Sequence, residues 1–297
     1  MKLVKLLHNP GAGDEAADKD KLETLVTGHG FECRYSSTKK DGWEAIDDEV
    51  DILAVAGGDG TIRKAAQMLL GRRLLDKAFP IGVLPLGTAN NIAQTLGLTG
   101  TDEEMVKAWQ HDNTRRIDVG RLWGVADTDF FIESFGYGIF PQLIKEMHKN
   151  ADDSLKPEEK LQVAAEKYHQ LAQEYEARHC ELFIDGKDYS GRYLVVEVMN
   201  IRSLGPNLEL APGADPGDGL LEVVLVPENN RDELVKYTQQ HLSGKGKPFE
   251  FYTVKGKEIS LIWQTSLCHA DDRLIKLAKQ APVNITVLEG VLEFLLM

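Results

Sequence analysis

A glycine-rich loop with a carboxylate at its centre follows the apolar segment Asp51–Ala56. The loop, Gly57–Thr61 (GGDGT), runs into a stretch with helical spacing, Ile62–Leu70. Glycine lets backbone N–H groups approach a phosphate closely, and a helix N-terminus adds positive potential. Asp59 would repel a nucleotide phosphate unless a divalent cation lies between them, so the loop indicates a metal–nucleotide site. The alternative is a tight turn whose aspartate caps a helix.

Two further loops of small residues follow apolar segments that resemble strands. Asn9–Gly13 (NPGAG) follows Lys2–His8, and Pro85–Asn90 (PLGTAN) follows a strand over Ile81–Pro85. Ligands of parallel sheets bind at the carboxyl ends of the strands, so the three glycine loops could hold one nucleotide. Each of them taken alone is a weak signal, because glycine-rich turns at strand ends are common.

Two other nucleotide-binding patterns are disfavoured. Gly11–Ala16 matches the dinucleotide fingerprint G-x-G-x-x-A, but Asn9 and Pro10 disturb the junction between strand and loop. The next strand also runs into Arg34–Thr38 without an acidic residue that could hold a ribose. No segment matches the Walker A pattern G-x-x-x-x-G-K-S/T.

Two acidic turns lie in the second half of the chain. Within 210–222, Asp215 and Asp218 and nearby backbone carbonyls could supply hard oxygen ligands to Mg²⁺, although an Asp-Gly turn between strands is the simpler interpretation. Near the end, Asp271 and Asp272 precede Arg273. A carboxylate here could act as general base for a substrate hydroxyl, or the segment could be an exposed turn.

Alternating strand and helix signals position the glycine loops. Strands are expected at 2–8, 31–35, 51–56 and 81–85, and helices at 21–27, 62–70 and from Ile92. This alternation predicts an α/β domain with a parallel sheet.

The pattern changes after about residue 123. Strands are expected at 129–135, 181–184, 193–199, 220–226, 257–263 and 283–288, and one helix over about 157–178. We therefore expect a β-sandwich-like second domain with one inserted helix over 123–288, after a nucleotide-binding domain over 1–122 that 289–297 could complete.

The composition and net charge of the 297-residue chain limit its partners. The 34 Lys and Arg against 47 Asp and Glu give a net charge of −13, which argues against nucleic acid. Three isolated cysteines fit a reducing cytosol, and no apolar run is long enough to span a bilayer. The first residues lack the pattern of a signal peptide, so we expect a cytoplasmic protein.

Taken in order, these segments resemble the catalytic domain of the diacylglycerol kinase family, in its bacterial lipid kinase form. The resemblance extends to sphingosine and ceramide kinases and, remotely, to NAD kinase. The motifs that carry it are collinear over nearly the whole chain: GGDGT at 57–61, PLGTAN at 85–90, DVG at 118–120, SFG at 134–136, Asn200, GP at 205–206, LAP at 210–212 and DGL at 218–220.

The resemblance implies an ATP site between two domains and two Mg²⁺ ions. The positions implied for ATP are Asn9, Pro10, Gly11, Gly13, Thr38, Gly57, Gly58, Asp59, Gly60, Thr61, Gly87, Thr88 and Asn90. Asp59 would act with the catalytic Mg²⁺, and a structural Mg²⁺ would be held by Asp215, Asp218 and the carbonyl of Leu220.

The chain departs from the family pattern at the turn that carries the proton acceptor. The family has Asp-Gly-Glu there, whereas this chain has Asp271-Asp272-Arg273, and arginine cannot accept a proton. Asp271 or Asp272 could take the role with a shifted loop, the base could lie elsewhere, or the chain could be catalytically impaired; we expect one of the two aspartates to be the base. The sequence predicts a Mg²⁺-dependent lipid kinase that meets its lipid transiently at a membrane surface. The alternatives are a catalytically impaired nucleotide- or lipid-binding homologue, and a kinase of a soluble acceptor such as NAD.

Overall fold

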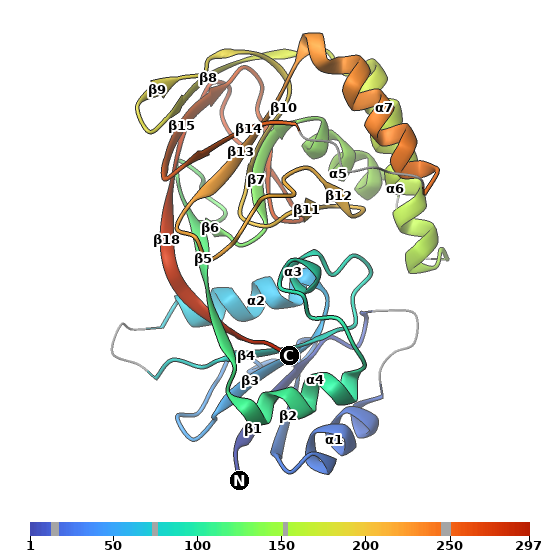
Figure 1. Ribbon diagram of the computed structural model, residues 1–297, viewed down its shortest axis with the longest axis vertical. Coiled ribbons are helices and arrows are strands. Elements are labelled where there is room, and N and C mark those ends of the chain that lie inside the picture. The colour runs from blue at the N-terminus through green and yellow to red at the C-terminus, as the bar shows by residue number, and fades with distance from the viewer. Residues whose placement is uncertain (13–17, 73–76, 151–153, 245–250) are drawn as a thin grey trace. The chain divides into compact units, whose positions relative to one another are not determined.

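A computed structural model of the chain describes residues 1–12, 18–72, 77–150, 154–244 and 251–297. The chain divides into two compact units (Figure 1). The first comprises 1–117 together with 290–297, and the second comprises 118–289. In the described parts of the chain, no helix has the length and apolar character that crossing a bilayer requires.

The first unit is built on a parallel sheet in the order β4-β3-β1-β2. Its strands are β1 (Leu3–His8), β2 (Glu32–Ser37), β3 (Ile52–Gly57) and β4 (Ile81–Pro85). Every residue of β1 and β3 is buried, as expected for parallel strands covered on both faces. Because the strands are parallel, the loops that follow them emerge at the same edge of the sheet.

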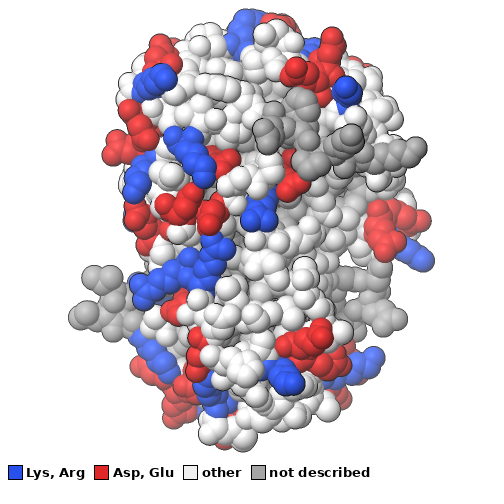
Figure 2. Space-filling model, in the orientation of Figure 1, with Lys and Arg blue, Asp and Glu red and all other residues white. Residues whose placement is uncertain are grey.

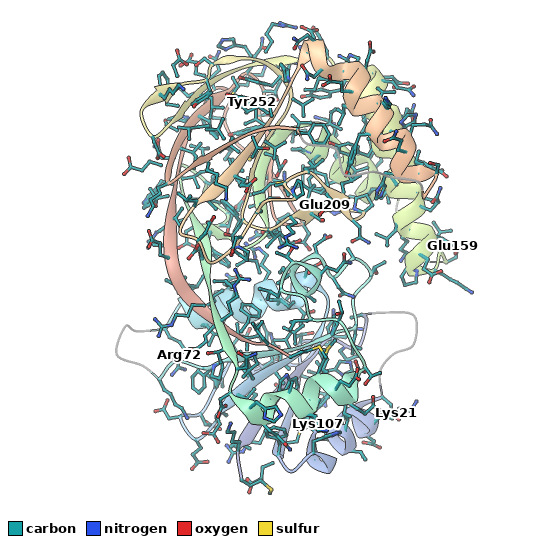
Figure 3. The ribbon with its side chains drawn as sticks, viewed as in Figure 1. Lys21, Arg72, Lys107, Glu159, Glu209 and Tyr252 are labelled. Carbon is teal, nitrogen blue, oxygen red and sulfur yellow. The ribbon has the colours of Figure 1, made fainter. Side chains whose placement is uncertain are left out.

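Helices of the first unit cover this sheet. They are α1 (Lys19–Gly28), α2 (Asp59–Leu70), α3 (Asn91–Thr95), α4 (Asp102–Ala108) and the 3₁₀ turn η1 (Trp109–His111). Thr101 and Glu104 form a capping box that fixes the start of α4. The exposed Lys21 and Lys107 lie on the solvent side of α1 and α4 (Figure 3).

The second unit is mainly antiparallel, with β10 pairing β7, β8 and β13. Its strands are β6 (Phe130–Phe131), β7 (Ser134–Gly138), β8 (Arg178–Ile184), β9 (Lys187–Asp188), β10 (Gly191–Met199), β11 (Ser203–Leu204), β12 (Leu208–Glu209), β13 (Leu221–Pro227), β14 (Tyr252–Gly256), β15 (Glu258–Trp263), β16 (Leu267–Ala270) and β17 (Arg273–Lys276). Strands β5 (Thr114–Trp123) and β18 (Pro282–Leu295) cross the boundary between the units along the chain. The predicted combination of an α/β and a β-sandwich-like domain is confirmed.

The described part of the second unit has three helices rather than one. They are α5 (Ile139–Lys149), α6 (Pro157–Glu174) and α7 (Arg231–Leu242), with a 3₁₀ turn, η2 (Glu228–Asn230), before α7. The sequence predicts only α6. The predicted helix runs to about residue 178, whereas α6 ends at Glu174 and Arg178 begins β8. The sequence pattern does not predict helix α5, because its first apolar residues directly continue the buried residues of β7.

Two hydrophobic clusters lie in the described part of the second unit. In one, Tyr137 stacks on Trp263 with ring centroids 5.3 Å apart. In the other, residues of the three helices pack on β10 and β13, with Tyr168 of α6 completely buried. These clusters hold the turn after β16 and the loop before β13, which carry the remaining predicted site residues.

Candidate functional site

The predicted nucleotide loops meet at the carboxyl edge of the first unit's sheet. The backbone N–H of Asn9 donates to the carbonyl of Ala56 near the end of β3 at 3.0 Å, and that of Thr38 donates to the carbonyl of His8 at the end of β1 at 2.9 Å. The N–H of Leu86 donates to the carbonyl of Gly57 at 3.1 Å. Four segments far apart in the sequence are thus tied together where a parallel sheet binds its ligands.

Glycines allow two of these loops to touch through their backbones. A Cβ on Gly58 would lie 2.9 Å from the Cα of Gly87, and a Cβ on Gly87 would overlap the Cα of Gly58. A Cβ on Gly57 would lie 2.5 Å from the hydroxyl of the buried Thr61. The glycines are therefore required for loop packing, in addition to any role in approaching a phosphate.

The Asp59 carboxylate connects the same two loops. It is the first residue of α2, and its oxygens accept the backbone N–H groups of Asn91 at 2.9 Å and Ile92 at 3.0 Å. These N–H groups belong to the first turn of α3, so Asp59 caps a helix other than its own. Carboxylate oxygens are ligands for Mg²⁺, whereas backbone N–H groups at a helix start can bind only an anion such as phosphate.

Asn90 holds the shape of its own loop. It adopts the left-handed conformation, with φ 53°, which asparagine tolerates better than most residues. Its side-chain oxygen accepts the N–H of Gly87 at 3.0 Å, and its amide nitrogen donates to the carbonyls of Pro85 at 2.9 Å and Gly87 at 2.7 Å. The amide is thus engaged within the loop, while Thr88 is exposed at the tip.

A lysine that the sequence pattern does not single out, Lys39, lies beside the loop that follows β1. The N–H of Gly11 donates to the side chain of Asn9 at 3.3 Å, which closes the turn after Pro10. The Lys39 ammonium lies 3.3 Å from where a Cβ of Gly11 would be, so it flanks the loop. An ammonium at this position suits a phosphate. Gly60 is part of α2, and Gly13 lies outside the described residues.

In the second unit, the two candidate bases lie in different surroundings. Asp271 is 3% exposed and has φ 53°, and its carboxylate accepts the backbone N–H groups of Ile132 at 3.1 Å and Glu133 at 2.8 Å. Asp272 is exposed at the tip of the hairpin between β16 and β17. Asp271 therefore organises the backbone, which makes Asp272 the better candidate for meeting a substrate hydroxyl.

Arg273 occupies the position at which the resemblance implies an acidic residue. Its guanidinium donates to the carbonyl of Asp127 at 3.1 Å. The side chain is thus anchored to a neighbouring loop of the same unit.

A buried pair, His269 and Glu197, contacts the hairpin between β16 and β17. His269 and Glu197 are both 0% exposed, with Nε2 2.7 Å from Oε1, and Nδ1 of His269 lies 2.8 Å from the carbonyl oxygen of Asp271. Burial acts to lower the pKa of His269, but the Glu197 carboxylate and the Asp271 carbonyl raise it overall. A Cβ on Gly136 would overlap the Glu197 carboxylate, so this glycine of the SFG motif makes room for the pair. No pattern in the sequence indicates this pairing.

Asp118 and Asn200 of the matched motifs also have structural contacts. The Asp118 carboxylate accepts the N–H of Gly219 at 2.8 Å. The Asn200 amide donates to the carbonyls of Asp118 and Ile132, both at 2.9 Å. These bonds fix the loop that precedes β13 against β5.

The predicted structural Mg²⁺ ligands lie on that loop, but a lysine shares it. Asp215 accepts the N–H of Gly217 at 2.9 Å, and Asp218 accepts that of Leu220 at 3.0 Å. The other oxygen of Asp218 accepts a hydrogen bond from the Lys255 ammonium at 3.0 Å. Over the residues that the structure describes, no group of three or more His, Cys, Asp and Glu side chains is arranged to hold a metal. With an ammonium on Asp218, the donor set does not suit a divalent cation.

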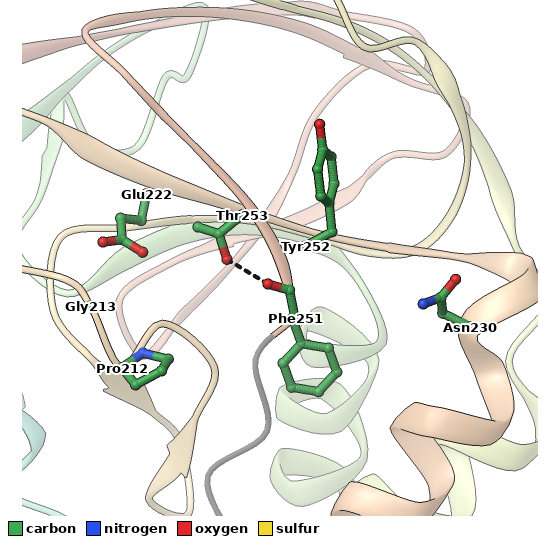
Figure 4. A pocket seen from close by; sticks show the side chains of 7 residues that line it. All are labelled: Pro212, Gly213, Glu222, Asn230, Phe251, Tyr252 and Thr253. Atoms are coloured by element: carbon green, nitrogen blue, oxygen red, sulfur yellow. Dashed lines mark hydrogen bonds between the residues drawn. The ribbon is translucent and has the colours of Figure 1, made fainter.

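A pocket of about 560 Å³ lies on the second unit (Figure 4). Its described lining contains none of the predicted site residues and consists of Pro212, Gly213, Glu222, Asn230, Phe251, Tyr252 and Thr253. The Thr253 hydroxyl donates to the carbonyl of Phe251 at 3.0 Å. On the face of the molecule shown in Figure 2, most basic side chains lie beside acidic ones, and no large patch of one sign is seen.

Comparison with known proteins gives two family matches. The diacylglycerol kinase catalytic domain matches residues 3–122, and the YegS C-terminal NAD kinase beta sandwich-like domain matches residues 145–295.

Individual proteins agree with these matches. A diacylglycerol kinase of Bacillus subtilis strain 168 is 26% identical over 258 residues, which cover 82% of this chain and 80% of that protein. A Cronobacter sakazakii protein named "Probable lipid kinase YegS-like" is 30% identical over 70% of each chain. The solved structure of a diacylglycerol kinase from Bacillus anthracis strain Sterne has a TM-score of 0.71 at 19% identity, covering 100% of this chain and 97% of that one.

Proposed function

The chain belongs to the family of diacylglycerol kinases and YegS-like lipid kinases, and on this premise we propose that it transfers the γ-phosphoryl group of ATP to a lipid hydroxyl. The relatives' names support a phosphotransferase that acts on lipids. Diacylglycerol is the first acceptor to test, because the B. subtilis relative is named for it.

The observation that carries the proposal is the meeting of the loops 57–61 and 85–90. Their glycines place two backbones in contact, and the Asp59 carboxylate joins them. Backbone N–H groups at strand ends would hold the phosphates, with Lys39 and Thr88 beside them. Mg²⁺, held through Asp59, would neutralise charge on the transferring phosphoryl group.

Transfer forms a bond between the lipid hydroxyl oxygen and the γ-phosphorus and breaks the bond to the β-phosphate oxygen, which leaves as part of ADP. The hydroxyl proton passes to a carboxylate, for which Asp272 is the candidate. Positioning and electrostatics account for most of the barrier reduction in such transfers. A peripheral enzyme would meet its lipid transiently at a membrane surface.

The test offers γ-³²P-labelled Mg-ATP to the purified protein with separate acceptors. These are diacylglycerol in mixed micelles, sphingosine, ceramide and NAD. Label in a lipid product supports the proposal, and the acceptor that is labelled identifies the lipid class. Label in NADP alone would replace it with the soluble-acceptor function.

A second candidate function is a nucleotide- or lipid-binding homologue without turnover. Arg273 at the acidic position, together with the engagement of Asp271 by backbone N–H groups, favours it. Tight binding of ATP without transfer to any acceptor would support this function. Arg273→Glu would then be expected to create turnover.

A further inference from the structure

Lys255 lies where it can neutralise the acidic loop, defined here as residues 215–220. It is on β14, directly opposite Glu222 on β13. Its ammonium is 3.0 Å from Asp218 Oδ2 and 3.3 Å from Glu222 Oε1. One cation thus joins the end of the acidic loop to the strand that follows it.

Glu222 makes this cation necessary. Its side chain is only 8% exposed, and its Oε1 faces the Lys255 ammonium at 3.3 Å. It lies beside Gly213, where a Cβ would be 3.3 Å from the same oxygen (Figure 4). Leaving a carboxylate at such a position without a cation is costly, because burial removes the water that would solvate it.

The ammonium competes with a divalent cation for the same carboxylate. The Oδ1 atoms of Asp215 and Asp218 accept hydrogen bonds from backbone N–H groups of their own loop. The Oδ2 atom of Asp218 accepts a hydrogen bond from the Lys255 ammonium at 3.0 Å. A Mg²⁺ ion bound at about 2.1 Å from that oxygen would lie close to the ammonium, and the two cations would repel each other.

We propose that the Lys255 ammonium serves in this chain as a built-in cation that replaces a divalent metal ion at the acidic loop. The loop then keeps its conformation without Mg²⁺. The proposal concerns the second unit alone and does not depend on kinase activity.

The test measures thermal unfolding without nucleotide or lipid. Wild type, Lys255→Met, Lys255→Arg and the control Lys257→Met are each heated in EDTA and in graded MgCl₂, with NaCl matched for ionic strength. Lys257 is a suitable control because it forms an exposed ion pair with Glu289, with side chains 54% and 59% exposed.

We expect Lys255→Met to melt about 2–6 °C below wild type in EDTA and to recover with MgCl₂ in a saturable way. Adding Asp218→Asn should abolish that recovery. Wild type, Lys255→Arg and Lys257→Met should respond to MgCl₂ no more than to NaCl.

A saturable stabilisation of wild type by MgCl₂ that Asp218→Asn removes would overturn the proposal, because the loop would then bind the metal beside Lys255. Equal melting of Lys255→Met and wild type in both solutions would also overturn it. Electron paramagnetic resonance of Mn²⁺ gives an independent count: Lys255→Met should bind one more ion per chain than wild type, and an unchanged count would contradict the proposal.

Discussion

Glu197→Gln tests whether the buried ion pair stabilises the second unit and the hairpin that carries Asp272. Glutamine keeps the shape of glutamate and can still accept a hydrogen bond from His269, but it removes the negative charge. It also places an amide group where Oε2 of Glu197 accepts no hydrogen bond from the described residues. Both partners are 0% exposed, so water cannot replace the lost interaction.

The size of the effect follows from this burial. Removing one partner of a buried ion pair costs about 3–5 kcal/mol. For a unit of this size each kcal/mol lowers Tm by about 2–4 °C, so the expected loss is about 6–20 °C near pH 6. The exposed pair of Arg192 and Glu228, with side chains 52% and 49% exposed, is the control. Glu228→Gln should cost less than about 1 kcal/mol.

The stability difference between wild type and Glu197→Gln should also depend on pH, which tests the charge of the pair directly. Because Glu197 raises the pKa of His269, the pair's contribution is fully present below the ordinary histidine pKa and is lost as pH rises through the raised value. In Glu197→Gln, desolvation still lowers the pKa of His269 and Asp271 still raises it, but the contribution of Glu197 is gone, so that variant should gain much less stability than wild type as pH falls. The difference in Tm should therefore be largest at pH 6 and shrink by pH 9.

Calorimetric unfolding at pH 6, 7.5 and 9 measures this difference. A loss below about 1 kcal/mol at pH 6 would show that the pair does not act as a charged unit. A difference that stays constant from pH 6 to pH 9 would contradict the linkage to His269.

Three further predictions concern the candidate site. Gly87→Ala places a Cβ on the neighbouring loop's backbone, so ATP affinity measured by calorimetry should fall at least about tenfold, with a stability loss of about 1–3 kcal/mol; affinity within twofold of wild type would argue against tight loop packing. Asp59→Asn should lower kcat by about 10²-fold in the lipid assay, and full turnover would exclude a charge role for Asp59. Asp272→Asn should lower kcat by about 10²–10⁴-fold with an unchanged Tm, whereas Asp271→Asn should lower Tm; full turnover of Asp272→Asn would place the base elsewhere.

Much of the first unit can be predicted from local patterns. The apolar runs before Asn9, Gly57 and Leu86 predict buried parallel strands, and parallel strands bring their carboxyl ends to one edge. The membership of the diacylglycerol kinase family, predicted from the order of the motifs, is confirmed. The assignment of ATP to individual residues, and of the catalytic Mg²⁺ to Asp59, stays a prediction.

The side-chain partners could not be predicted, because they depend on contacts between distant segments. Asp59 bonds to the start of a helix more than 30 residues away, and His269 pairs with Glu197 across 72 residues. Lys255 reaches Asp218 because β14 pairs with β13. Periodicity identifies strands and helices, but it contains no information about which buried charges will meet.

The decisive measurement for phosphoryl transfer from ATP to a lipid hydroxyl is the stoichiometry of the reaction. ADP release and phospholipid formation are measured in the same reaction, with Mg-ATP and diacylglycerol in mixed micelles. A lipid kinase should form one phospholipid for each ADP released. ADP release without phospholipid on any lipid offered, or no ADP release while ATP binding is intact, would contradict it.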